Sequence, residues 1–151
     1  MASLLDISDL KGDKNYISLG KIKPEIITFL KEKVPNLISK IDSNTEIIFW
    51  KDRLKHTELH KKDFQSDNEF YNCLEKIPTI IQEPDYIGIH PKDNSISFIK
   101  DFSSHIIVAV RISSTGILSY RTMYPLMDAQ LTHYIDKGYA WKWNKKLDYD
   151  I

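Results

Sequence analysis

The sequence predicts an α+β fold, in which N-terminal helices pack on a four- to five-stranded antiparallel sheet and a C-terminal helix follows. The 151 residues are 42% hydrophobic and 11% aromatic, which suits a single buried core. Helical spacing of apolar residues dominates as far as Pro84, and short runs of strand composition follow it. Helices first and adjacent strands second is the order typical of α+β proteins.

The first third of the chain contains two strand-like runs with a proline-punctuated helical stretch between them. Residues 15–22 (NYISLGKI) have the composition of a strand or extended arm. Pro24 favours a helix start, and Pro35 is expected to break or kink that helix. Residues 45–50 (TEIIFW) have strand composition.

The remaining two thirds contain two further helices, a set of strands and a last helix. Amphipathic helices are predicted over 51–63 and 67–82, with Pro78 expected to shorten the second. A final helix is predicted over 127–137, closed by Gly138. The strands predicted between them are Tyr86–His90, Ser95–Lys100, Ser104–Ser113 and Ile117–Tyr124.

The last two strands form a predicted hairpin, because the three-residue loop 114–116 places a glycine where a left-handed residue is needed. The favoured register pairs Arg111 with Ser119 and Ala109 with Arg121. A slip by one residue would place Arg111 on the other face, and the cleaner apolar face favours the first register. That apolar face comprises Val108, Val110, Ile112, Leu118, Tyr120 and Thr122.

Charge is balanced in total and separated along the chain. The 21 basic and 21 acidic side chains give a formal net charge of zero, which argues against a strongly basic nucleic-acid binder. The net charge is +3 over residues 51–62, −5 over 63–85 and +4 over 137–146. A local phosphate site is therefore compatible with neutrality, and a small substrate or a partner that delivers it is favoured.

Arginine is scarce, with three residues against 18 lysines. Arginine is favoured where a planar, bidentate, permanently charged group is needed. Arg111 and Arg121, with Lys100 on a neighbouring strand, would make a cationic sheet face suited to a phosphodiester. The alternative is a solvated face with ordinary cross-strand pairs.

His56 and His60 lie four residues apart, so a helix would place both rings on one face. They could act as an acid and a base, since imidazole titrates near neutrality. They could also hold a metal with a third ligand from elsewhere, or be ordinary exposed helix residues.

Cys73 is the single cysteine, which excludes an internal disulfide and fits a reducing compartment. The longest aliphatic run, 106–110, is far shorter than the ~20 residues of a membrane helix. The N-terminal residues lack the features of a secretion signal. A cytoplasmic location without membrane contact is expected.

Several short segments resemble the phage-associated branch of a nuclease superfamily that groups barnase, EndoU, the tRNA-cleaving colicins and RelE toxins (BECR). The resemblance covers about residues 44–126. The segments are Glu46–Trp50, Arg53–His56 with His60, Ile77–Ile81, Pro84–Ile87, Phe98–Lys100, Ile106–Arg111 and Leu118–Tyr124.

By position, His56 or His60 would match the helix histidine of the family's "H…RH" stretch. Lys100 and Arg111 would match its basic strand residues. Thr122 would match the hydroxyl of its last strand. The sequence departs from the family around His60, where a leucine precedes it and a lysine, in place of proline, follows it.

The resemblance implies a toxin-like, metal-independent endoribonuclease without a cofactor, in which the RNA 2′-OH is the nucleophile and the product is a 2′,3′-cyclic phosphate. His60, or alternatively His56, would transfer protons, while Arg111 would stabilise the transition state and Thr122 would orient the phosphate. The residues expected to hold the RNA are Lys55, Lys100, Arg121 and Tyr124.

The expected substrate is RNA, with tRNA and mRNA left open, and an inhibitor or antitoxin protein is a candidate partner. Residues 1–43 would form an N-terminal strand/helix extension and residues 44–151 the BECR-like nuclease domain, together one compact unit. The alternative function is a non-catalytic phage or prophage module of the same fold that binds RNA or protein.

Overall fold

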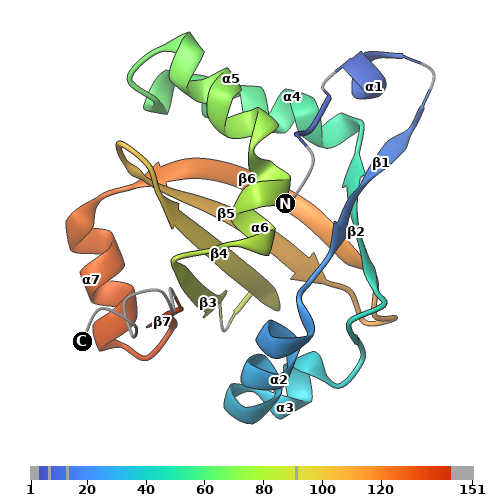
Figure 1. Ribbon diagram of the computed structural model, residues 1–151, viewed down its shortest axis with the longest axis vertical. Helices are drawn as coiled ribbons and strands as arrows, with labels where there is room; N and C mark the ends of the chain where they lie inside the picture. Colours follow the sequence, from blue (N-terminus) through green and yellow to red (C-terminus); the bar gives the residue numbers. More distant parts are fainter. Residues whose placement is uncertain (1–3, 7, 13, 91, 144–151) are drawn as a thin grey trace.

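A computed structural model describes residues 4–6, 8–12, 14–90 and 92–143 (Figure 1). Its strands are β1 (Tyr16–Lys21), β2 (Glu46–Trp50), β3 (Tyr86–His90), β4 (Ser95–Asp101), β5 (His105–Ile112), β6 (Leu118–Leu126) and β7 (Ala140–Lys142). Its helices are α1 (Ser8–Lys11), α2 (Pro24–Lys33), α3 (Pro35–Ile38), α4 (Asp52–Glu58), the 3₁₀ helix η1 (Lys61–Asp63), α5 (Asp67–Glu75), α6 (Ile77–Gln82) and α7 (Asp128–Asp136).

The described strands form one seven-stranded sheet in the order β1-β2-β6-β5-β4-β3-β7. The α+β class is confirmed, but the prediction of a purely antiparallel sheet of four to five strands is wrong. The neighbours β2 and β6 are parallel, since Ile47 pairs with Leu118 and Ile48 with Ser119. The three-residue strand β7 follows the last helix and is too short to show an alternating pattern.

Most helices pack on one face of the sheet, which we call the covered face. In Figure 1, α6 lies across β4 and β5 on this face. At its centre the ring of Phe49 on β2 stacks on Tyr120 of β6, with centroids 4.2 Å apart and planes 10° apart. The buried helix residues that share this core include Ile26, Leu30, Leu54, Phe70, Leu74, Ile77, Ile80 and Ile81.

Prolines set the helix boundaries. Pro24 and Pro35 begin α2 and α3, which confirms the predicted break between them. The predicted helix over 67–82 is divided at Lys76, because Pro78 lacks the N–H needed to continue α5 and fits the first turn of a new helix. The predicted helix over 51–63 ends at Glu58, and a turn and η1 follow.

The other face of the sheet, which we call the open face, is covered by α7 at one end only. There Leu131 of α7 packs against Ile99, Ile107 and Leu126. Gly138, at φ +77°, follows the end of α7 as predicted. No helix among the described residues is both long and apolar enough to cross a membrane.

A row of small residues crosses five strands of the open face. In this row Ala140, Gly88, Ser97, Ala109 and Thr122 are successive cross-strand partners. A Cβ on Gly88 would lie 2.8 Å from the Tyr139 carbonyl oxygen, so only glycine lets the α7–β7 connection come this close. Short side chains along the row leave the middle of the open face hollow.

A β-bulge interrupts the β5–β6 hairpin. The predicted pairing of Arg111 with Ser119 is confirmed, but Ala109 pairs with Thr122 and leaves Arg121 as the extra residue. The predicted pair of Ala109 with Arg121 is therefore wrong. Thr122 moves from the expected apolar face to the open face, because the extra residue reverses the alternation of the strand.

Candidate active site

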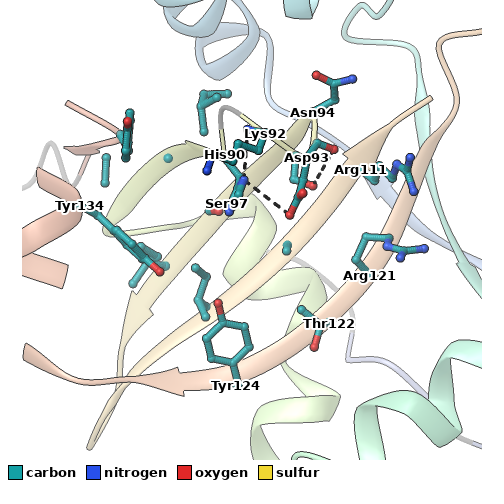
Figure 2. Close-up of a pocket in the computed structure, with 18 of the residues that line it drawn as sticks. His90, Lys92, Asp93, Asn94, Ser97, Arg111, Arg121, Thr122, Tyr124 and Tyr134 are labelled. Carbon is teal, nitrogen blue, oxygen red and sulfur yellow. Dashed lines mark hydrogen bonds and ion pairs between the residues drawn. The ribbon is translucent and has the colours of Figure 1, made fainter. Parts of the chain in front are cut away.

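The hollow on the open face is a cavity of about 710 Å³, which we call the central pocket. Its floor contains Gly88, Ser97 and Ala109. Figure 2 shows Arg111 and Arg121 together at one end, with Tyr134 at the other and Tyr124 alongside. The pocket therefore joins a cationic end to an aromatic end over a floor of small residues.

All three arginines of the chain line the central pocket. Arg111 and Arg121 extend from adjacent strands, and among the described residues neither forms an ion pair with an acid. Arg53 lies in the first turn of α4, and its Nε donates to the Arg121 carbonyl oxygen at 3.0 Å. Burial, and next the charge of Arg121, lower the pKa of Arg53. Two unpaired guanidinium groups are thus available for an anion.

His56 lines the central pocket, and His60 lies directly beside it. Their ring centroids are 5.8 Å apart, and the His60 ring lies 5.6 Å from that of Tyr124. Burial lowers the pKa of His56, and the charges of Arg53, His60 and Arg121 lower it further. His56 is therefore neutral at pH 7 and able to accept a proton.

His60 has a different environment, in the turn between α4 and η1. Its Nδ1 donates to Asp63 Oδ2 at 3.0 Å, which orients the ring and leaves Nε2 for another partner. Among the described residues, no three His, Cys, Asp or Glu side chains form a group that could hold a metal ion.

Thr122 supplies a hydroxyl next to the arginines. Its Oγ1 is buried and has no hydrogen-bond partner within the described part of the chain. A buried polar atom without a partner is costly and is often explained by a ligand or water that completes the site. The Thr122 hydroxyl therefore has unused hydrogen-bonding capacity at the pocket.

The aromatic end of the pocket is built by Tyr124, Tyr134 and Tyr139. Tyr124 belongs to β6, whereas the other two come from α7 and the connection that follows it. Burial raises the pKa of Tyr124, so its phenol stays protonated at neutral pH. These rings offer apolar surface with hydroxyl groups at the edge, which is suited to a planar ring.

The β3–β4 turn contributes Lys92 and Asp93, which the sequence did not single out, and His90 at the end of β3 lines the pocket with them. His90 Nδ1 lies 3.5 Å from Asp93 Oδ2 (Figure 2). The register of the strands could have indicated these residues, because His90 pairs with Ser95 and Ser95 pairs with Arg111. These pairs place the turn beside the arginine end.

Of the remaining predicted site residues, Lys100 lies away from the pocket and Lys55 lies beside it. Lys100 alternates with Ile99 on β4 and so belongs to the covered face, where its Nζ donates to the Glu83 carbonyl oxygen at 2.6 Å. Lys55 lines a neighbouring groove of about 1100 Å³, which we call the side groove. The side groove shares all three arginines with the central pocket.

The structure thus brings His56, Arg111, Arg121, Thr122 and Tyr124 together, with His60 in ring contact and Lys55 in the adjoining groove.

Comparison with known proteins places the chain in a family. A search of curated proteins and a search of solved structures gave no match. The model of the family described as phage-Barnase-EndoU-ColicinE5/D-RelE like nuclease3 matches residues 20–133. The match includes every strand from β2 to β6 and the first two thirds of α7, and it begins upstream of the segment that the sequence motifs indicated. The chain therefore belongs to this phage-Barnase-EndoU-ColicinE5/D-RelE like nuclease family.

Proposed function

We propose that the protein is a metal-independent endoribonuclease that cleaves RNA at the central pocket. The observation that carries this proposal is the grouping of all three arginines with His56 and a free threonine hydroxyl on one hollow sheet face. Phosphoryl transfer requires charge stabilisation and proton transfer, and these residue types supply both. The nuclease family of the chain supports a phosphodiester as the substrate.

RNA carries its own nucleophile, the 2′-OH, so the protein has to move two protons and stabilise one transition state. His56 accepts the proton of the 2′-OH, because its lowered pKa keeps the ring neutral at pH 7. The 2′-oxygen then bonds to phosphorus, and the bond from phosphorus to the 5′-oxygen breaks. The products are a 2′,3′-cyclic phosphate and a 5′-hydroxyl end.

The leaving 5′-oxygen requires a proton, and His60 is our candidate for its donor. Its ring contacts that of His56, with centroids 5.8 Å apart, so both histidines can reach one phosphate bound beside them. Asp63 accepts from Nδ1 and so orients the ring, with Nε2 left to face the leaving oxygen.

Arg111 and Arg121 bind the non-bridging phosphate oxygens, whose negative charge increases in the transition state. Thr122 donates its otherwise unused hydroxyl to the same group and orients it. Tyr124 and the neighbouring tyrosines hold the base of the reacting nucleotide.

The test is incubation of the purified protein with total RNA, followed by analysis of the new ends. Replacing His56, His60 or Arg111 by alanine is expected to lower cleavage by more than about 100-fold, in line with typical acid–base and charge-stabilising contributions. His133→Ala is the matched control, because His133 is exposed on α7 and lies outside the pocket. Thermal unfolding checks that each variant is folded.

Four results would contradict this function. Cleavage that disappears with EDTA would show that a metal is required. Cleavage that survives both histidine substitutions would show that other groups move the protons. RNA that stays intact but migrates more slowly in the presence of the protein would favour the non-catalytic binding module. Expression in a bacterial host without any loss of growth would favour it too.

A further inference from the structure

The side groove continues the open face beyond the arginines. It is lined by residues of α4, of the hairpin β5–β6 and of the end of β2, and it shares Arg53, Arg111 and Arg121 with the central pocket. In Figure 2, the Arg111 and Arg121 side chains extend away from Tyr134 and the aromatic end. A phosphate held by these guanidinium groups would therefore lie where the central pocket and the side groove meet.

Trp50 lines the side groove and is 41% exposed, although tryptophan is normally buried to a large extent. It is the last residue of β2, and its cross-strand partner on β1 is Tyr16. The two rings lie 5.3 Å apart at 56°. Tyr16 does not itself line the groove, and its ring contact helps to hold the indole in place beside the groove.

The charge around Trp50 favours an anionic occupant. The groove is lined by five basic side chains, Lys51, Arg53, Lys55, Arg111 and Arg121, and by two acidic ones, Asp52 and Glu58. Lys51 donates to the Gly12 carbonyl oxygen at 2.7 Å, and Arg53 donates to that of Arg121. Lys55, Arg111 and Arg121 form no ion pair with an acid within the described part of the chain.

An exposed aromatic ring beside unpaired cations is the combination that binds single-stranded nucleic acid. Each base stacks on the ring whatever its identity, and the cations hold the phosphates between successive bases. A base that is paired and stacked in a duplex cannot lie flat on a side chain in this way.

We infer that the side groove is a second nucleotide subsite, in which a base of single-stranded RNA stacks on Trp50. This base and the base held by the tyrosines lie on opposite sides of the scissile phosphate. This inference rests on the proposed function and specifies its substrate class. Lys55 binds the phosphate that follows the stacked base. The substrate is thus an unpaired segment with a base on each side of the cleaved bond.

A binding measurement tests the subsite without requiring cleavage. A single-stranded tetranucleotide with 2′-deoxyribose lacks the nucleophile, so it binds and stays intact. We expect it to quench tryptophan fluorescence, and we expect Trp50→Phe to lose most of the quenching while binding within about threefold of the wild type. Trp50→Ala should weaken binding about tenfold, as expected for one stacked base. Ile117→Ala, an exposed apolar residue outside both cavities, should change neither signal.

A kinetic measurement then assigns the effect to the base. Cleavage of a complete tetranucleotide is compared with cleavage of an abasic version of the same molecule. The abasic version lacks the base that lies next to the scissile phosphate on the side of the side groove. Trp50→Ala should lower kcat/KM about tenfold for the complete substrate and leave kcat/KM for the abasic one unchanged.

The outcomes separate the subsite from the reaction. Cleavage by the wild type without quenching, or an equal loss on both substrates, would overturn the subsite and leave the ribonuclease function standing. Quenching without cleavage of any RNA would support the subsite and overturn the ribonuclease function. Absence of all oligonucleotide binding, or equal affinity for a duplex, would overturn the subsite and favour a protein partner for Trp50.

Discussion

Arg53 acts on the site through the backbone of another arginine. Its guanidinium group donates to the carbonyl oxygen of Arg121, the extra residue of the bulge in β6. The bulge turns two consecutive residues, Arg121 and Thr122, toward the open face, whereas a regular strand would bury one of them. Arg53 is thus a positioning residue, and one hydrogen-bonded contact helps to determine which side chains a phosphate can reach.

The pH at which His56 titrates reports this arrangement directly. Because burial and neighbouring cations disfavour its charged form, we expect the pKa of the His56 ring to lie below the ordinary imidazole value, and the acid limb of the cleavage profile to fall as the pH drops through this lowered pKa. Removing one cation with Arg121→Ala should raise the pKa of His56, and Arg121→Lys should leave it lowered. NMR titration of the ring protons, assigned with His56→Ala, measures the pKa of His56 in both variants without an activity assay. An unchanged pKa in Arg121→Ala would contradict the electrostatic coupling.

At the scale of elements, whether a segment forms a helix or a strand is easier to predict from the sequence than which strands pair with each other. Composition and turn residues predicted most strands and α7, because both are local properties of the chain. The parallel pairing of β2 with β6 joins segments far apart in sequence, and no local pattern reports it. The same limit applies to the site: scarcity of arginine indicated Arg111 and Arg121, but Lys100 alternates onto the covered face and the β3–β4 turn reaches the pocket only through sheet register.

Helix α7 is tied to the β4–β5 hairpin by a histidine between two carboxylates. His105 Nε2 donates to Asp128 Oδ1 at 2.5 Å, and Nδ1 donates to Asp101. Burial opposes the charged ring, but the two hydrogen bonds and the two carboxylate charges outweigh it and raise the pKa of His105. Both bonds require the imidazolium form, because neutral imidazole has a single N–H.

The stabilisation from this histidine is therefore present in full below the ordinary pKa of about 6.5 and lost as the pH rises through the raised folded-state pKa. We expect Asp128→Asn to lower Tm most at pH 5.5, with a difference from wild type that shrinks toward pH 9. Asp136→Asn, at the other end of α7, should give a difference that does not vary with pH over that range. A constant Asp128→Asn difference would contradict the role of His105.

At the scale of the whole molecule, a net charge of zero coexists with a locally cationic face. Arg111, Arg121, Lys55 and Lys92 line the two cavities, and the acids of the segment 63–85 balance the total. The basic run over 137–146 extends beyond the described residues, which end at 143. A division of the chain at residue 43 stays a prediction, while one core includes Leu19 and Ile26 together with the sheet.

Such a molecule should bind single-stranded nucleic acid with a limited dependence on salt. Four phosphate contacts correspond to a slope of about −3 in a plot of log affinity against log salt concentration, since each contact contributes about 0.7 for single strands. Titration of a longer single-stranded deoxyoligonucleotide, whose phosphates outnumber these contacts, at several salt concentrations measures this slope. Lys55→Ala should reduce its magnitude by about 0.7, and Lys62→Ala, an exposed lysine outside both cavities, should leave it unchanged. A slope as steep as about −6 would indicate many more contacts.

The pairing of β2 with β6 also decides when the site can exist during biosynthesis. Ile48 meets Ser119, which leaves the ribosome about 70 residues later, or about 4 to 14 s at ordinary elongation rates. Until then β2 has no inner neighbour, and His56 and Arg53 have no Arg121 beside them. If the proposed function holds, a nascent chain is inert toward the RNA that surrounds it, and reactivity begins only when β6 closes the gap between the two halves of the sheet.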